Sequence, residues 1–217
     1  RIVDDPETGE FDREAAQGLI AAQDEFSEKT GNPCMIDVVG ASRDSMVRYM
    51  DFVAGATKAP ILVDGVSLEI KFAGLEYANQ SGLAERAVFN SLLPEYKGPD
   101  LEKIRALGVK NAVLLAYNPK EMTIGGRMKT VRGLLAMARD AGIEKVMVDT
   151  VVMDLPSLGP ASRAIVEVKN ELGLPAGSGC HNAIATWRGL KTKMGLQALK
   201  PCIASSRTLS TPSQPRP

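Results

Sequence analysis

The chain has 217 residues, of which 44% are hydrophobic, and its 26 basic side chains are matched by 26 acidic ones. This composition is that of one soluble globular domain, and the zero formal net charge argues against nucleic acid as a partner. No apolar stretch approaches the roughly 20 residues that span a bilayer, and the first residues lack the apolar core of a signal peptide, so we predict a cytoplasmic protein without membrane insertion.

In chain order, amphipathic helices alternate with short β-branched apolar runs. The first helix is expected to begin after Asp12 as N-cap and to end at Thr30 and Gly31. Its apolar residues, which recur at intervals of three or four, are Ala15, Leu19, Ala22 and Phe26. Further helices are predicted at 42–53, 67–79, 99–107, 127–141, 157–172 and 183–194, and most end near a glycine.

Six apolar runs between these helices read as strands, and each stops on an Asp or an Asn at intervals of roughly thirty residues, the length of one strand-plus-helix unit. The six stops are Asp37, Asp64, Asn90, Asn118, Asp149 and Asn182. Because parallel strands share one carboxyl end, all six polar residues are predicted to lie on the same rim.

Strict alternation of strand and helix specifies an α/β protein with a parallel sheet. An open Rossmann sheet would carry an early G-x-G-x-x-G, but the chain offers only the late Gly177–Gly179 turn without the third glycine. We therefore predict a (β/α)8 TIM barrel that lacks its first and last strands, in one domain over residues 1–204. The Ser- and Pro-rich segment 205–217 has no acidic residue and is predicted to be a low-complexity, disordered tail.

Four of the strand-end residues, Asp64, Asn90, Asp149 and Asn182, form a set of carboxylates and amides that suits a flat heterocycle such as a pterin or a purine. The alternative is that each one caps the following helix. Ser67 and Ser157 occupy such cap positions, and Asp149 precedes its helix by too many residues to be its cap.

Other reactive residues are few. His181 is the only histidine and is read as a zinc ligand, a general base or a backbone hydrogen-bonding residue. The three cysteines show no C-x-x-C spacing, so no disulfide framework or metal site is predicted. Arg127 is read either as a binder of an anionic tail or as a solvated residue at a helix start.

Several segments together resemble the MtrH family of tetrahydromethanopterin S-methyltransferase subunits, whose bacterial relatives move methyl groups between corrinoid proteins and tetrahydrofolate. The similarity runs in order from Arg1 to about Ser205, without the family's opening strand. The segments that carry it are 11–16, 29–40, 49–53, 90–91, 116–119, 141–145, 149–150 and 177–182.

This resemblance implies a pterin-binding barrel of the dihydropteroate synthase-like type, acting as a methyltransferase in one-carbon metabolism. The methyl group would pass between a corrinoid (cobalamin) carried by a partner protein and N5 of tetrahydrofolate or tetrahydromethanopterin, with a homodimer as the implied assembly. By position, Asp64, Asn90 and Asp149 match the groups that hold the pyrimidine edge, and Asn182 matches the catalytic Asn near N5. Asp37 and Asn118 are further substrate-binding candidates.

Two alternatives stay open at this point. One is a barrel lyase or isomerase that binds a phosphorylated substrate at the Gly177–Gly179 turn. The other is a non-catalytic or truncated subunit of a methyltransferase assembly.

Overall fold

The computed structural model describes residues 2–186, which divide into two compact units. The first unit comprises the described residues up to Asn90 together with residues 106–110. The second comprises Ser91–Arg105 and the described residues from Asn111 onward. The predicted domain boundary at 204 and the predicted tail lie outside the described residues.

The first unit opens with an antiparallel pair, β1 (Val3–Asp5) and β2 (Glu10–Phe11), where the sequence predicted no strand. Strands of two and three residues are too short to show an alternating pattern, so the hairpin left no sequence signal. The rest of the unit follows the predicted alternation. It consists of α1 (Arg13–Thr30), β3 (Ile36–Gly40), α2 (Arg43–Ala56), β4 (Ile61–Gly65), α3 (Leu68–Gln80) and β5 (Ala87–Leu92), of which β5 continues into the second unit.

The predicted ends of α1 are confirmed, but its inward face is a different one. The Asp12 side chain accepts a hydrogen bond from the backbone N–H of Ala15, and Gly31 ends the helix in the left-handed conformation with φ of 69°. The residues that α1 buries are Ala16 and Ile20. Leu19 and Phe26, from the apolar series in the sequence, are 48% and 65% exposed.

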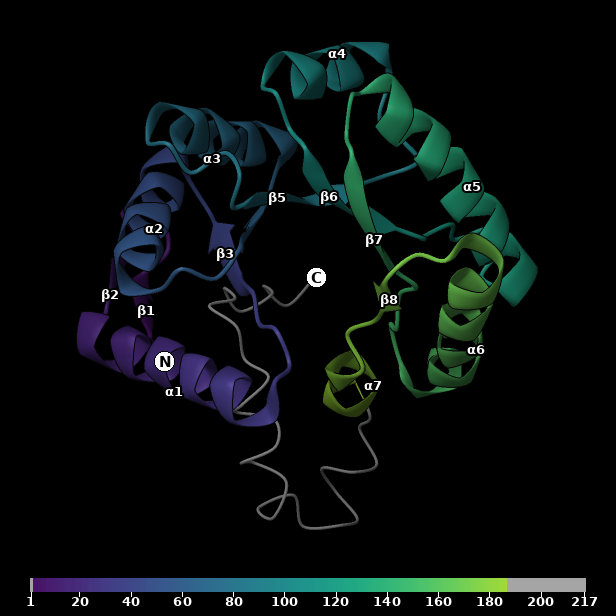
Figure 1. Cartoon of the computed structure of the whole chain (residues 1–217), viewed down its shortest axis with the longest axis horizontal. Coiled ribbons are helices and arrows are strands. Elements are labelled where there is room, and N and C mark those ends of the chain that lie inside the picture. Colours follow the sequence, from purple (N-terminus) through teal and green to yellow (C-terminus); the bar gives the residue numbers. More distant parts are fainter. Residues whose placement is uncertain (1, 187–217) are drawn as a thin grey trace, which may run out of the picture. The chain divides into compact units, whose positions relative to one another are not determined.

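In the first unit β3, β4 and β5 pair in parallel in that order, and α2 and α3 pack side by side against β3 and β4 (Figure 1). The residues buried along β3 and β4 alternate, as expected for strands with one face toward helices. A Cβ on Gly74 of α3 would lie 2.5 Å from Cγ1 of Val63, so this glycine allows the helix to approach β4 closely. Because Val63 faces α3, its neighbour Asp64 points to the opposite face of the sheet.

The second unit continues with the same alternation. Its elements are α4 (Gly98–Ala106), β6 (Asn111–Leu115), α5 (Ile124–Asp140), β7 (Lys145–Asp149), α6 (Leu155–Leu172), β8 (Ala176–Gly177) and α7 (His181–Ala185). The strands β6, β7 and β8 pair in parallel in that order, and α5 packs against α6 (Figure 1).

Helix starts in the second unit differ from the prediction by a few residues. The N-cap of α5 is Thr123, so Arg127 lies inside the helix instead of starting it. The N-cap of α6 is Asp154, and Ser157 is the third helical residue, which completes a capping box with Asp154. The short helix α7 is described only to its end at Ala185, and most of the predicted helix 183–194 lies outside the described residues.

The predicted fold class is therefore confirmed at the level of an α/β protein in which six parallel strands are flanked by helices. Closure into a TIM barrel stays a prediction. Among residues 2–186, no helix is both long enough and apolar enough to cross a bilayer.

Candidate functional site

Three of the predicted residues lie on one face of the sheet in the first unit. Asp37 aligns with Leu62 of β4, and Asp64 aligns with Val39 of β3, so both carboxylates share a face. From β5, the Asn90 side chain donates a hydrogen bond to Asp37 Oδ1 at 3.4 Å. Since β4 lies between β3 and β5, strands about 4.8 Å apart would hold these side chains well beyond contact on a flat sheet, so the contact indicates that this face is concave.

The prediction that all six polar residues mark strand ends is wrong for part of the set. Asp37 is the second residue of β3, so it lies within the strand, and β5 continues for two residues beyond Asn90. The Gly-rich segment leaves β8 with only two residues, which places Asn182 on α7. Asp149 is the last residue of β7, as predicted.

The Asp64 carboxylate is held by two donors on one oxygen. Its Oδ1 lies 3.0 Å from Nζ of Lys71 on α3 and accepts a hydrogen bond of 2.7 Å from the backbone N–H of Gly65. Lys71 is buried although it is charged. The sequence analysis gave Lys71 no role, so this ion pair is new information from the structure.

Asp37 is the more buried of the two carboxyls. Loss of solvent, and then the negative charge of Asp64, raise the pKa of Asp37 to about 6, while the Asn90 hydrogen bond and the positive charge of Lys71 oppose the rise. The Asp37 carboxyl therefore changes its charge close to neutral pH.

In the second unit Asp149 supports the loop that follows β7. Its Oδ1 accepts a hydrogen bond of 2.7 Å from the backbone N–H of Val151. Burial raises the pKa of Asp149, and both the Val151 hydrogen bond and the charge of His181 oppose this. Val151 has φ of 61°, a left-handed conformation that a β-branched residue rarely adopts. Strained backbone of this kind is concentrated at functional sites.

The Asn182 side chain also binds this loop, since Nδ2 donates a hydrogen bond of 3.0 Å to the carbonyl of Val152. Within the described part of the chain, no donor contacts its Oδ1. Asn118 is the third residue after β6 and forms a turn in which Oδ1 accepts from the N–H of Lys120 at 3.1 Å. The carbonyl part of the Asn118 amide is therefore used locally.

Arg127 is neither solvated nor open to an anionic ligand, contrary to both readings of the sequence. Its side chain is 1% exposed and donates to the carbonyls of Thr150 at 2.7 Å, Val151 at 3.3 Å and Met122. Burial lowers the pKa of this guanidinium. Together, Arg127 and Asn182 bind the carbonyls of three successive residues, Thr150 to Val152, directly after Asp149.

We expect Arg127→Met to destabilise the protein by about 2 to 4 kcal/mol, because three carbonyls lose a charged donor. Denaturant unfolding measures the loss, and hydrogen exchange at the Val151 amide reports on the loop. Arg132→Met, which removes a half-exposed arginine from the same helix, should change stability by less than about 1 kcal/mol. Equal effects of the two substitutions would contradict the role given to Arg127.

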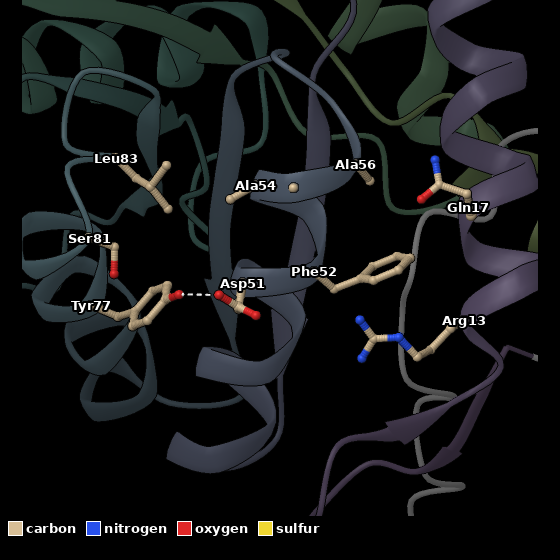
Figure 2. A pocket seen from close by; sticks show the side chains of 10 residues that line it. Arg13, Gln17, Asp51, Phe52, Ala54, Ala56, Tyr77, Ser81 and Leu83 are labelled. Atoms are coloured by element: carbon tan, nitrogen blue, oxygen red, sulfur yellow. Dashed lines mark hydrogen bonds between the residues drawn. The ribbon is translucent and has the colours of Figure 1, made fainter.

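A cavity of about 500 Å³ in the first unit lies away from the predicted residues. Figure 2 shows that its walls come from α1, α2 and the end of α3, with Tyr77 donating a hydrogen bond to Asp51 at 2.8 Å. None of the six predicted site residues lines it. Within residues 2–186, no three His, Cys, Asp or Glu side chains are grouped as metal ligands.

A sequence model of the family described as "Tetrahydromethanopterin S-methyltransferase MtrH subunit" matches residues 1–207. The chain belongs to the MtrH family. The resemblance drawn from the sequence segments is therefore confirmed.

Curated MtrH relatives bear the names of methyltransferase subunits. The tetrahydromethanopterin S-methyltransferase H subunit of Methanopyrus kandleri is 36% identical over 204 residues, which are 89% of this chain and 63% of the relative. The protein of the same name from Methanothermobacter marburgensis is 36% identical over 88% of this chain and 64% of the relative. The "Putative methyltransferase mtx" H subunit of Methanosarcina barkeri is 32% identical over 88% of this chain and 65% of the relative. This MtrH chain thus spans just under two thirds of the length of these relatives.

Neither the lyase or isomerase alternative nor the non-catalytic alternative finds support in these MtrH matches. In this MtrH chain, the described residues form two groups, with Asp37, Asp64 and Asn90 in the first unit and Asp149 and Asn182 in the second. Convergence of the two groups on one cavity stays a prediction.

Proposed function

We propose that the chain binds the ring system of a tetrahydropterin and transfers a methyl group between its N5 atom and a corrinoid carried by a separate protein. The observation that carries this proposal is the MtrH match over residues 1–207. The relatives are named for tetrahydromethanopterin, and tetrahydrofolate shares the ring atoms that the site residues would contact. Either pterin is therefore a candidate substrate.

The geometry of the first unit suits the pyrimidine edge of such a ring. That edge presents adjacent N–H and NH₂ donors, for which carboxylates are the matching acceptors. Asp64 and Asp37 offer carboxylate oxygens on one concave face, and Asn90 adds an amide that accepts and donates. In this proposal, Asp149 contributes a further carboxylate from the second unit, and Asn118 is a peripheral contact.

Transfer of a methyl group needs no nucleophile from the protein. The corrinoid, when bound to its partner protein, supplies the cobalt that carries the methyl group. The work of this chain is to hold N5 in line with that methyl group and to manage the N5 lone pair. Methyl leaves N5 when the nitrogen accepts a proton or hydrogen bond, and N5 accepts methyl when its lone pair is free.

Asn182 is the residue to which we assign this task at N5. Its hydrogen bond to the Val152 carbonyl fixes the amide plane, which leaves Oδ1 and the second N–H for the ligand. An amide that donates or accepts suits a reversible step. We further propose that the chain works as a homodimer with the corrinoid protein docked over the pterin.

The test uses the 217-residue chain, methylcobalamin as methyl donor, and tetrahydrofolate and tetrahydromethanopterin in separate reactions. We expect pterin binding at micromolar levels in equilibrium dialysis and loss of the methylcobalamin absorbance only when the chain and a pterin are both present. A folded sample that binds neither pterin would contradict the proposal. Displacement of the ligand by inorganic phosphate would favour the lyase class instead.

A further inference from the structure

Lys71 occupies a position of α3 that faces the interior. It shares the buried face of this helix with Ala73, Gly74, Leu75 and Ala78, and its side chain is 11% exposed. Among the described residues, Lys71 and Arg127 are the only basic or acidic residues that are buried. Lysine is rarely buried without a specific partner, so its presence here needs an explanation.

Folding alone gives no reason for a lysine at this position. Lys71 is the fourth residue of α3, and its N–H bonds to the carbonyl of the N-cap Ser67 at 3.2 Å. The first turns of a helix carry partial positive charge, which disfavours a cation there. Burial adds a desolvation cost, and an apolar residue of similar length would avoid both.

The position of Lys71 relative to Asp64 is fixed by close packing. The short connection of Val66 and Ser67 joins β4 to α3, and the contact of Gly74 with Val63 holds the helix against the strand. A Cβ on Gly65 would meet Ile70 Cγ2 at 2.9 Å, so the helix start is also close to the end of β4. This packing leaves the Lys71 ammonium little freedom to leave the Asp64 carboxylate.

The contacts of Asp64 divide its two oxygens. Oδ1 receives both the Lys71 ammonium and the Gly65 N–H. Within the described residues, no donor contacts Oδ2. A carboxylate held by one oxygen presents the other in a fixed direction, which favours a ligand that donates a hydrogen bond.

We propose that Lys71 is a positioning residue of the pterin site: its ammonium fixes the Asp64 carboxylate for the ligand and offsets the mutual repulsion of Asp64 and Asp37. This inference rests on the proposed function for its ligand, whereas its electrostatic part concerns the free protein. Lys71 acts through the carboxylates and needs no contact with the substrate.

The charge balance gives the proposal a readout that a structural role would not move. The charged groups acting on Asp37 are Asp64 from β4 and Lys71 from α3, while the neutral Asn90 from β5 donates to it. Since the positive charge of Lys71 lowers the pKa of Asp37, its removal must raise that pKa above its present value of about 6. The ionised form of Asp37 accepts the ligand's N–H groups, so pterin affinity is expected to fall as pH drops through this pKa.

The experiment compares Lys71→Met, Lys71→Arg and the unchanged chain by two measurements. The first is an NMR titration of the Asp37 carboxyl carbon without ligand. The second is the pH dependence of pterin affinity. For Lys71→Met we expect both midpoints to move up by about half to one pH unit and affinity at pH 7 to fall about tenfold. Lys71→Arg, which keeps the charge, should leave the midpoints near those of the unchanged chain.

Lys29→Met is the matched control, because it removes an exposed lysine from the same unit. It should change neither midpoint. A folded Lys71→Met protein with unchanged midpoints and affinity would overturn the inference. If the unchanged chain bound no pterin while the Asp37 titration still moved, the proposed function would fail and only the electrostatic role of Lys71 would stand.

Discussion

Asp64→Asn is expected to weaken tetrahydropterin binding by about 2 to 4 kcal/mol, or roughly 30- to 800-fold. The substitution keeps the size of the side chain but removes the charge that strengthens hydrogen bonds from the pyrimidine edge. It also leaves the Lys71 ammonium buried beside a neutral amide, so the protein should lose stability as well. Equilibrium dialysis and denaturant unfolding measure the two effects separately.

The double variant Asp64→Asn/Lys71→Met separates ligand binding from folding. It removes the unpaired ammonium, so we expect stability to recover most of the loss while pterin affinity stays low. If the double variant regained affinity together with stability, Asp64 would be a structural partner of Lys71 and not a ligand of the pterin.

Asn182→Ala is expected to slow methyl transfer by roughly 30- to 1,000-fold, equivalent to about 2 to 4 kcal/mol of transition-state stabilisation. The effect should appear mainly in the rate at saturating pterin, because the residue is assigned to N5 and not to the pyrimidine edge. The methylcobalamin absorbance assay measures this rate. The loss of the bond to Val152 makes a stability measurement on the same sample necessary.

Thr186→Ala is a suitable control for the short helix α7, since the Thr186 hydroxyl bonds the backbone carbonyl of Asn182 and leaves the amide untouched. It should change the transfer rate by less than about threefold. An Asn182→Ala protein with unchanged rate and unchanged pterin affinity would remove Asn182 from the mechanism.

The sequence predicted the alternation of elements well because local patterns determine it. The β-branched runs mark all six parallel strands, and the caps at Asp12 and Ser67 are where side-chain chemistry places them. Strand ends were less accurate. β5 runs past Asn90 because Ser91 and Leu92 are themselves buried, which a rule that ends strands at a polar residue does not anticipate.

The supporting residues of the site were missed for one physical reason. In α3, Lys71 falls in phase with Gly74 and Ala78, and in α5, Arg127 falls in phase with Val131 and Leu134. A charged side chain at a core-facing helical position is a sequence signal of a buried cation, although charged residues are usually assigned to the solvent face. The partners of these cations come from distant segments, and only the folded chain shows them.

The conformation of Val151 has a consequence for protein engineering. A β-branched residue with φ of 61° is an obvious target for thermostabilisation, because glycine there would remove an unfavourable backbone geometry. The same exchange would let the chain between β7 and α6 sample other conformations. Since the Val151 amide is bonded to the Asp149 carboxylate, a more heat-resistant variant made in this way would hold that carboxylate less firmly. At this position durability and substrate affinity are opposing design goals.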